Sequence, residues 1–406
     1  MLYPAVLAVC LSLLQTADFS ADGMKALNAQ KYDEAAALFT KAIAADPADY
    51  SARFNLALAQ TMLHNDAEAI ANYRKVLEMK PGLYEAELNL GILLLREKQP
   101  AEAVSPLQAA SDQKPKEFRP RLYLAQALLE GGEFAKSEQA YQAAADLDPK
   151  SAAAQFGLAQ CKAKQNRLDE AAPYFRKAAE MDAGFKDGLL ELASLYEKAG
   201  RKADAIPLYQ QFPDDIGARE RLAELLLEAG RAADAIPHLE WAVQKSPTTA
   251  NRVALALAYR RNKQPDKELV LLQQAVASDP GNADLHMLYG RSLREQKNYA
   301  EAARQFFLVT QAKPDSVEAW DSLAGMLHGL GDYTQALAAL DRVRALGGET
   351  EIDHYLRAII LDKAMDIKGA LLSYEKFLAM SQGKHPDEEF KARQRVRILQ
   401  KEAARR

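Results

Sequence analysis

Residues 51–84 read SARFNLALAQTMLHNDAEAIANYRKVLEMKPGLY, and residues 85–118 read EAELNLGILLLREKQPAEAVSPLQAASDQKPKEF. Their small residues, Ala57 and Gly91, belong to a column that runs through most of the chain. The column is Gly23, Ala57, Gly91, Ala125, Ala159, Ala193, Ala223, Ala256, Gly290, Ala324 and Ala358. Eight of its ten gaps are 34 residues long, and the other two are 30 and 33 residues. A period in this range is typical of a stacked repeat array.

Two further columns and a set of prolines accompany the small residues. An alanine follows about twelve positions after each small residue, except where Ser137 and Glu268 replace it, and a large apolar or aromatic residue follows four positions later. Because residues four apart share one helix face, these columns predict two closely packed helices per unit. Proline cannot continue a helix. Prolines close many units: Pro47, Pro81, Pro115, Pro149, Pro247, Pro280 and Pro314.

These columns resemble the tetratricopeptide repeat, in which the same residue types recur about every 34 residues. The resemblance covers residues 18–383 as eleven units, and it implies an all-α, right-handed solenoid of helical hairpins. The unit at residues 186–215 is four residues short. We expect its second helix to end at Gln211 or Phe212, just before Pro213, with a local break in the superhelix.

The composition gives no support for catalysis. The chain has 406 residues, of which 27% are charged, and a net charge of −4, which does not favour a nucleic-acid partner. No HExxH motif, nucleophile elbow or phosphate-binding glycine loop is present, and no two histidines share a metal-ligand spacing of four. Asp214 and Asp215 follow Pro213 and suit the start of the next helix rather than paired-carboxylate chemistry. We therefore expect a protein without enzymatic activity, cofactor or metal.

Residues 1–17 precede the first repeat. The segment Met1–Leu14, MLYPAVLAVCLSLL, is almost wholly apolar and too short to span a bilayer, which takes about 20 residues. It resembles the core of a secretory signal peptide, although no Lys or Arg precedes it. We expect export to the periplasm or the exterior, with cleavage after Ala17 or Gly23 and no stable membrane insertion afterwards. An apolar cap on the first repeat and an uncleaved anchor are the alternatives.

The resemblance implies that partners bind on a concave face lined by the first helix of each unit. The inward positions flank the small column, and asparagines beside it contact the backbone of an extended peptide in related arrays. The candidate peptide-binding residues are Phe54, Asn55, Leu58, Leu88, Asn89, Ile92, Leu122, Gln126 and Phe156. The alternative is that the apolar residues pack between neighbouring helices.

A second candidate surface is basic. Arg260, Arg261, Arg291 and Arg294 lie in repeats eight and nine, where they could bind an acidic peptide or a terminal carboxylate through charge-assisted hydrogen bonds. The alternative is a solvated charged face.

Residues 384–406 are expected to form a C-terminal capping helix. Pro386 suits its first turn, and Ala392, Val396 and Leu399 form an apolar stripe at helical spacing. The remaining residues are strongly basic. A solubilising cap over the last repeat explains this pattern, and contact with nucleic acid or anionic lipid is the alternative.

These features together predict a non-catalytic scaffold that binds a protein or peptide partner. The alternatives are a periplasmic chaperone and an accessory subunit of an envelope enzyme complex. Tight binding of one partner would indicate a scaffold, whereas weak binding of many unfolded proteins would indicate a chaperone. The sequence does not indicate the oligomeric state.

Overall fold

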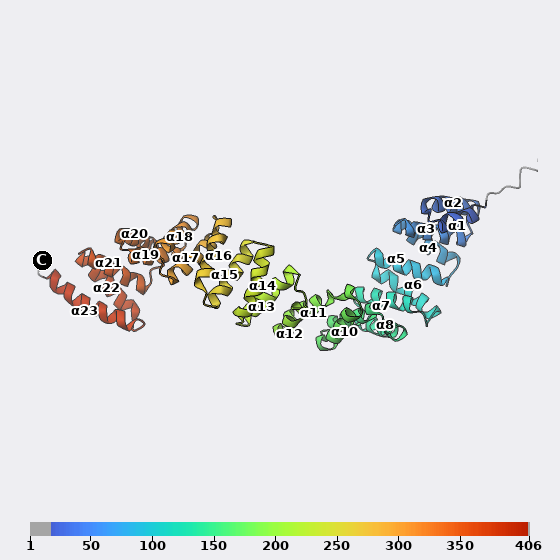
Figure 1. Ribbon diagram of the computed structural model, residues 1–406. Coiled ribbons are helices and arrows are strands. Elements are labelled where there is room, and N and C mark those ends of the chain that lie inside the picture. Colours follow the sequence, from blue (N-terminus) through green and yellow to red (C-terminus); the bar gives the residue numbers. More distant parts are fainter. Residues whose placement is uncertain (1–17, 405–406) are drawn as a thin grey trace, which may run out of the picture. The chain divides into compact units, whose positions relative to one another are not determined.

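The computed structural model describes residues 18–404, so the predicted signal peptide at residues 1–17 lies outside the described residues. Within residues 18–404 the chain forms twenty-three α-helices, one short 3-10 helix and no β-strand (Figure 1). Eleven successive pairs of helices run from α1 and α2 to α21 and α22, and α23 follows them. The predicted all-α repeat fold is confirmed.

The helices fall into two compact units, one extending to Leu208 and one beginning at Tyr209. The first contains α1 (Phe19–Asn28), α2 (Tyr32–Ala45), α3 (Tyr50–Met62), α4 (Asp66–Met79), α5 (Tyr84–Arg96), α6 (Pro100–Gln113), α7 (Phe118–Glu130), α8 (Phe134–Leu147), α9 (Ala152–Lys164), α10 (Leu168–Met181), η1 (Ala183–Phe185), α11 (Gly188–Lys198) and most of α12 (Lys202–Tyr209).

The second unit contains α13 (Ile216–Glu228), α14 (Ala232–Lys245), α15 (Thr249–Arg261), α16 (Pro265–Ser278), α17 (Ala283–Glu295), α18 (Tyr299–Ala312), α19 (Val317–Leu330), α20 (Tyr333–Ala345), α21 (Glu351–Lys363), α22 (Ile367–Ser381) and α23 (Pro386–Ala403). The boundary between the units thus lies in the short repeat.

The predicted end of the second helix in the short repeat was wrong. α12 ends at Tyr209, two residues before the earlier of the two predicted positions. A tight turn follows, in which the Phe212 amide donates to the Tyr209 carbonyl at 3.1 Å. Because a residue before proline avoids the α-helical region, Pro213 disfavours the helical conformation that the prediction required of Phe212.

Each hairpin closes on the small-residue column. All eight alanines of that column have no exposed surface. A Cβ atom added to Gly91 would lie 2.3 Å from Leu107 Cγ, and one added to Gly290 would lie 2.7 Å from Phe306 Cε1. The large residue of the second helix therefore packs directly against the backbone of the first helix, as the columns predicted.

The two exceptions in the alanine column are buried polar residues with hydrogen-bond partners. Ser137 Oγ donates to the Ala125 carbonyl at 2.6 Å, and Glu268 Oε1 accepts from Ser292 Oγ at 2.5 Å. Buried polar groups are tolerated where such partners exist. These bonds explain how the closely packed hairpin accommodates a polar residue in place of alanine at each of the two positions.

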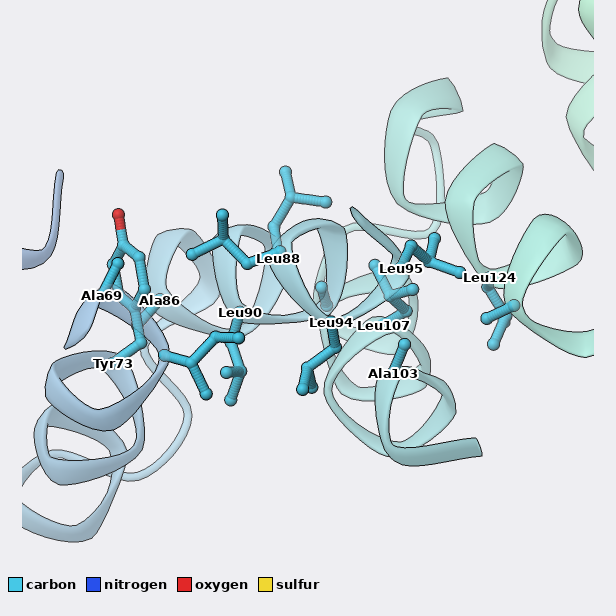
Figure 2. Close-up of a cluster of buried hydrophobic side chains, with 14 of the residues drawn as sticks. Ala69, Tyr73, Ala86, Leu88, Leu90, Leu94, Leu95, Ala103, Leu107 and Leu124 are labelled. Atoms are coloured by element: carbon cyan, nitrogen blue, oxygen red, sulfur yellow. The ribbon is translucent and has the colours of Figure 1, made fainter. Parts of the chain in front are cut away.

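One hydrophobic cluster of the first unit is continuous across neighbouring repeats. Figure 2 shows leucines of α5, Leu90 and Leu94, between Tyr73 of α4 and Leu107 of α6. The same cluster extends to Leu124 on α7. Each repeat thus buries apolar surface against its neighbours, which is how a solenoid without a central core is stabilised.

The turn between the two helices of each hairpin has a left-handed residue at a fixed position. The series is Gln30, His64, Lys98, Gly132, Asn166, Gly200, Gly230, Lys263, Lys297, Gly331 and Met365, with φ between 57° and 82°. Glycine adopts this conformation without strain, whereas other residues pay a modest cost. The turn is therefore imposed by the repeat packing and not only by local preference.

The C-terminal helix forms as predicted. α23 begins at Pro386, and Ala392 and Leu399 bury their side chains in a cluster with Ala358, Tyr374 and Phe377 of the last repeat. Val396 packs partly against the same cluster.

Candidate functional site

The predicted peptide-binding residues lie on four successive first helices of the first unit. α3 carries Phe54, Asn55 and Leu58; α5 carries Leu88, Asn89 and Ile92; α7 carries Leu122 and Gln126; and α9 carries Phe156. Helix α7 contacts both α5 and α9. The structure separates these residues into two groups with different surroundings.

The group on α3 and α5 is largely engaged in packing. Leu88 is only 7% exposed and belongs to the cluster of Figure 2, while the Phe54 ring stacks edge-on against Tyr73 with centroids 5.6 Å apart. Asn89 Nδ2 donates to the Tyr73 hydroxyl at 3.2 Å. These contacts favour the packing alternative for Phe54 and Leu88. Asn55 is half-buried and has no hydrogen-bond partner for its side chain among the described residues.

The group on α7 and α9 lines an open groove. This cavity, named here the α7–α9 groove, has a volume of about 640 Å³. It is lined by Leu122, Gln126, Leu129, Glu130, Gly132, Phe134, Tyr141, Ala153, Phe156, Gly157, Gln160, Lys164 and Phe185. Three predicted residues, Leu122, Gln126 and Phe156, are therefore brought together here.

Gly157 accounts for the floor of the groove. The Tyr141 ring of α8 lies on the α9 backbone, so that a Cβ atom added to Gly157 would lie 2.2 Å from Tyr141 Cζ. Two repeats earlier, Tyr73 and Asn89 occupy the corresponding positions, and the asparagine donates to the tyrosine hydroxyl. Glycine in place of asparagine removes both the side-chain volume and that donor.

The Tyr141 hydroxyl is consequently free. The side chain is 5% exposed, yet its hydroxyl has no hydrogen-bond partner between residues 18 and 404. Burial raises the pKa of Tyr141, with smaller contributions from Cys161 and Glu130, so the hydroxyl stays protonated at neutral pH. Tyr141 lines the open groove, so its hydroxyl is available to hydrogen-bond with water or with a ligand.

Aromatic rings form one wall of the groove. The Phe156 ring contacts Phe175 with centroids 5.7 Å apart and Phe185 with centroids 5.2 Å apart. Gly188 lets Phe156 approach, since a Cβ atom there would lie 2.6 Å from Phe156 Cε2. Phe185 belongs to η1, the short helix between α10 and α11.

Sequence reasoning missed Phe185 and the role of Tyr141. The signal for Phe185 was the absence of a closing proline in the fifth repeat, where Ala183 stands at that position and begins η1. The signal for Tyr141 was Gly157, a glycine at the position that Asn55 and Asn89 occupy in repeats two and three.

The rim of the groove is polar. Gln126 Nε2 donates to Glu130 Oε1 at 2.8 Å, and Gln160 Nε2 donates to Glu191 Oε2 at 3.3 Å. Lys164 is exposed and forms no salt bridge within the described part of the chain. The groove thus combines an apolar interior with a rim that offers amides, carboxylates and one unpaired cation.

The predicted arginine patch lies in the second unit, where ion pairs connect successive first helices. Arg260 of α15 pairs with Glu295 of α17, and Arg291 of α17 pairs with Glu318 of α19. These two pairs favour the alternative of a solvated charged face. Arg261 Nη1 donates to the Leu227 carbonyl at 2.9 Å. Arg294 is exposed and forms no salt bridge among residues 18–404.

The described residues contain no group of three or more His, Cys, Asp or Glu side chains arranged to hold a metal ion. The lone thiol among them, Cys161, is buried and donates to Ser137 Oγ at 3.1 Å. Burial raises its pKa, so it is a poor nucleophile at neutral pH.

Comparison with known proteins agrees with the geometry. One tetratricopeptide repeat profile matches residues 22–84, 67–118, 122–184 and 220–283, and two related tetratricopeptide repeat profiles match residues 259–327 and 189–212. The chain belongs to the tetratricopeptide repeat family. Proteins of this family serve as scaffolds for protein interaction, and this array is one of them.

Individual relatives of this tetratricopeptide repeat array are distant. The human protein O-mannosyl-transferase TMTC1 is 26% identical over 102 residues, which are 24% of this chain but only 12% of that protein. The solved structure of MamA residues 41 to the end, from Desulfovibrio magneticus RS-1, is 23% identical and covers 41% of this chain and 94% of its own, with a TM-score of 0.39. MamA AMB-1 is also 23% identical, covers 41% of this chain and 99% of its own, and has a TM-score of 0.39.

Proposed function

We propose that the protein is a non-catalytic scaffold that holds an extended segment of a partner protein in the α7–α9 groove. The observation that carries this proposal is the groove itself, about 640 Å³ in volume, with a largely buried tyrosine at its floor whose hydroxyl has no partner among the described residues. Pockets of this kind, apolar with a few convergent polar groups, are the usual sites of recognition.

The interior of the groove suits a bulky apolar side chain. Leu122 and Leu129 come from α7, and Phe156 and Phe185 supply aromatic surface from α9 and η1. Burial of one large apolar side chain stabilises a complex by about 1.5–3 kcal/mol. We therefore expect an apolar anchor side chain to make a substantial contribution to affinity.

The polar groups suit the backbone and flanking residues of the segment. The Tyr141 hydroxyl can donate to a backbone carbonyl of the segment, and the Lys164 ammonium can pair with an acidic side chain or a terminal carboxylate. We expect binding to favour peptides that place an acidic group beside the apolar anchor.

We further propose that the protein is exported and works in the periplasm or outside the cell. The support is the apolar segment Met1–Leu14, and the start of the array bears on where cleavage would fall. α1 begins at Phe19, and the Asp18 side chain caps it by accepting from the Ala21 amide at 2.9 Å. Cleavage after Ala17 would leave this cap intact, whereas cleavage after Gly23 would remove half of the helix. No helix between residues 18 and 404 has the length and hydrophobicity needed to cross a bilayer.

The test begins with selection of peptides from a displayed random library against the full chain. Calorimetry then compares the wild type with Leu122→Gln and with its matched control Leu58→Gln, since both leucines are half-buried on first helices. We expect enriched peptides to share a bulky apolar residue, and Leu122→Gln to lower affinity by about tenfold. Leu58→Gln should have little effect.

Two outcomes would contradict the proposal. Loss of affinity in Leu58→Gln without loss in Leu122→Gln would place the site on α3 and α5. Weak binding of peptides with no shared anchor, unaffected by either substitution, would favour the chaperone alternative.

A further inference from the structure

The outward face of the C-terminal helix α23 combines unpaired positive charge with exposed apolar side chains. Residues 390–401, FKARQRVRILQK, contain five cations and no carboxylate. With about 100° between successive residues, Phe390, Gln394, Arg397 and Lys401 lie on one face, and Lys391 and Ile398 lie at its edge. Ala392 and Leu399 lie on the opposite face, where they pack against the last repeat.

Two of the five cations have partners within the protein. Arg393 pairs with Glu389 at 2.6 Å, and Arg395 pairs with Asp362 at 2.5 Å. Lys391, Arg397 and Lys401 are exposed and form no salt bridge with any described residue. The three cations without partners therefore lie on the outward face or at its edge, and Arg393, about 60° from Phe390 around the helix, is paired with Glu389.

The apolar residues of this face are exposed to solvent. Phe390 is 63% exposed, the highest fraction among the large apolar side chains of residues 18–404, and Ile398 is 44% exposed, which is within the range of other surface apolar residues of the array. The two lie eight residues apart and are separated by cations, so the face alternates between apolar and positive groups.

We propose that α23 docks on an anionic lipid surface, with Phe390 and Ile398 inserted at the level of the acyl boundary and Lys391, Arg397 and Lys401 against the headgroup phosphates. A helix that lies in the membrane interface has this combination of a basic polar surface and apolar side chains. The proposal is independent of the α7–α9 groove, because it concerns other residues in the other unit.

Lipid accounts for this face better than nucleic acid does. Phosphate contacts would explain the cations alone, but an exposed isoleucine gains nothing from a nucleic-acid backbone. Asp387 lies beside Phe390 and Lys391 on this side of the helix, but both it and Glu388 are confined to the first turn, where they stabilise the helix N-terminus.

Vesicle co-sedimentation of the full chain tests the proposal. The wild type is compared with Lys391→Gln/Arg397→Gln/Lys401→Gln on vesicles of phosphatidylcholine alone and of phosphatidylcholine mixed with phosphatidylglycerol. Each cation near an anionic surface contributes about a fivefold factor in binding, so the triple variant should bind roughly a hundredfold more weakly to the mixed vesicles. Higher ionic strength should weaken the wild type.

The matched control is Lys116→Gln/Lys150→Gln/Lys177→Gln, which removes the same net charge from exposed lysines of the first unit that form no salt bridge among the described residues. It should bind like the wild type. A local readout excludes binding through the N-terminal apolar segment, which all variants share. Phe390→Trp should show blue-shifted fluorescence, quenched by brominated phosphatidylglycerol, beyond the signal of the two native tryptophans.

Three results would overturn the proposal: equal binding of wild type and α23 variant to the mixed vesicles, equal losses in both triple variants, or no spectral change in Phe390→Trp. Loss of oligonucleotide binding in the α23 variant, without any vesicle binding by the wild type, would also overturn it.

Discussion

Tyr73 and Tyr141 occupy equivalent repeat positions. Removal of the hydroxyl should lower the stability of the fold at Tyr73 but not at Tyr141, and should lower peptide affinity at Tyr141 but not at Tyr73. The Tyr73 side chain has no exposed surface, and its hydroxyl accepts from Asn89 at 3.2 Å. Tyr73→Phe removes that bond and leaves the half-buried amide without its partner. Such a loss costs about 0.5–1.5 kcal/mol. Tyr141→Phe removes no bond within the described residues, so we expect its stability to change by less than about 0.5 kcal/mol.

Chemical denaturation of the two single variants and the wild type measures this difference. Because a repeat array can unfold in stages, hydrogen exchange of α4–α5 and α8–α9 should accompany the denaturation curves. With a peptide selected for the groove, Tyr141→Phe should weaken binding by about 0.5–1.5 kcal/mol, whereas Tyr73→Phe should not. If Tyr141→Phe destabilises the protein as much as Tyr73→Phe does, the hydroxyl is not free and the account of the groove floor is wrong.

Three further substitutions test the packing and the groove wall. Gly91→Ala would place a methyl group 2.3 Å from Leu107 Cγ and should destabilise the fold by about 1–3 kcal/mol in thermal melts; an unchanged melting temperature would refute the close helix approach. Burial raises the pKa of Glu268, and this effect outweighs the hydrogen bond from Ser292, which lowers it. Because the folded protein disfavours the ionised carboxylate, the wild type loses stability as pH rises through the raised pKa of Glu268. Glu268→Gln should therefore be more stable than the wild type at pH 7 and lose that advantage as pH falls below the pKa of an unfolded glutamate, about 4.3; denaturation curves that show the opposite trend would contradict this. Phe185→Ala should lower peptide affinity through loss of the aromatic wall, about 0.5–1.5 kcal/mol per ring pair, in calorimetry, and unchanged affinity would remove η1 from the site.

The fold could be predicted because its determinants recur. A single small residue such as Ala57 is uninformative, but the same position in eleven units specifies where two helix backbones meet. The start of α23 could also be predicted, since Pro386 is followed by three acidic residues, as is typical of a helix N-terminus. The end of α12 was not, because the prediction took Pro213 itself as the stop, whereas the helix ends earlier, at Tyr209.

The groove was only partly predictable because it depends on departures from the repeat. Leu122, Gln126 and Phe156 follow the pattern, and all three line the groove. Tyr141 also follows the pattern, and only the loss of the asparagine side chain at Gly157 frees its hydroxyl. Phe185 lies in an inter-repeat segment, whose conformation is set by tertiary packing and not by the columns.

The predicted binding role of the residues on α3 and α5 stays a prediction, although packing explains Phe54 and Leu88. In the sequence, an apolar residue beside the small column is compatible both with peptide binding and with packing between helices. Only the burial of its side chain in the structure distinguishes the two interpretations. The arginines of the second unit show the same limit, because the partners Glu295 and Glu318 lie 35 and 27 residues away in the sequence.

Site-specific photo-crosslinking in the native host tests the central claim most directly. A benzophenone amino acid replaces Gln126 at the groove rim in one strain and Arg260 in the second unit in another, and mass spectrometry identifies the crosslinked peptides. The account predicts that the Gln126 position captures one defined partner through a segment with a bulky apolar residue, and that Phe156→Ser abolishes this product. Crosslinks to that partner from the Arg260 position alone would contradict it.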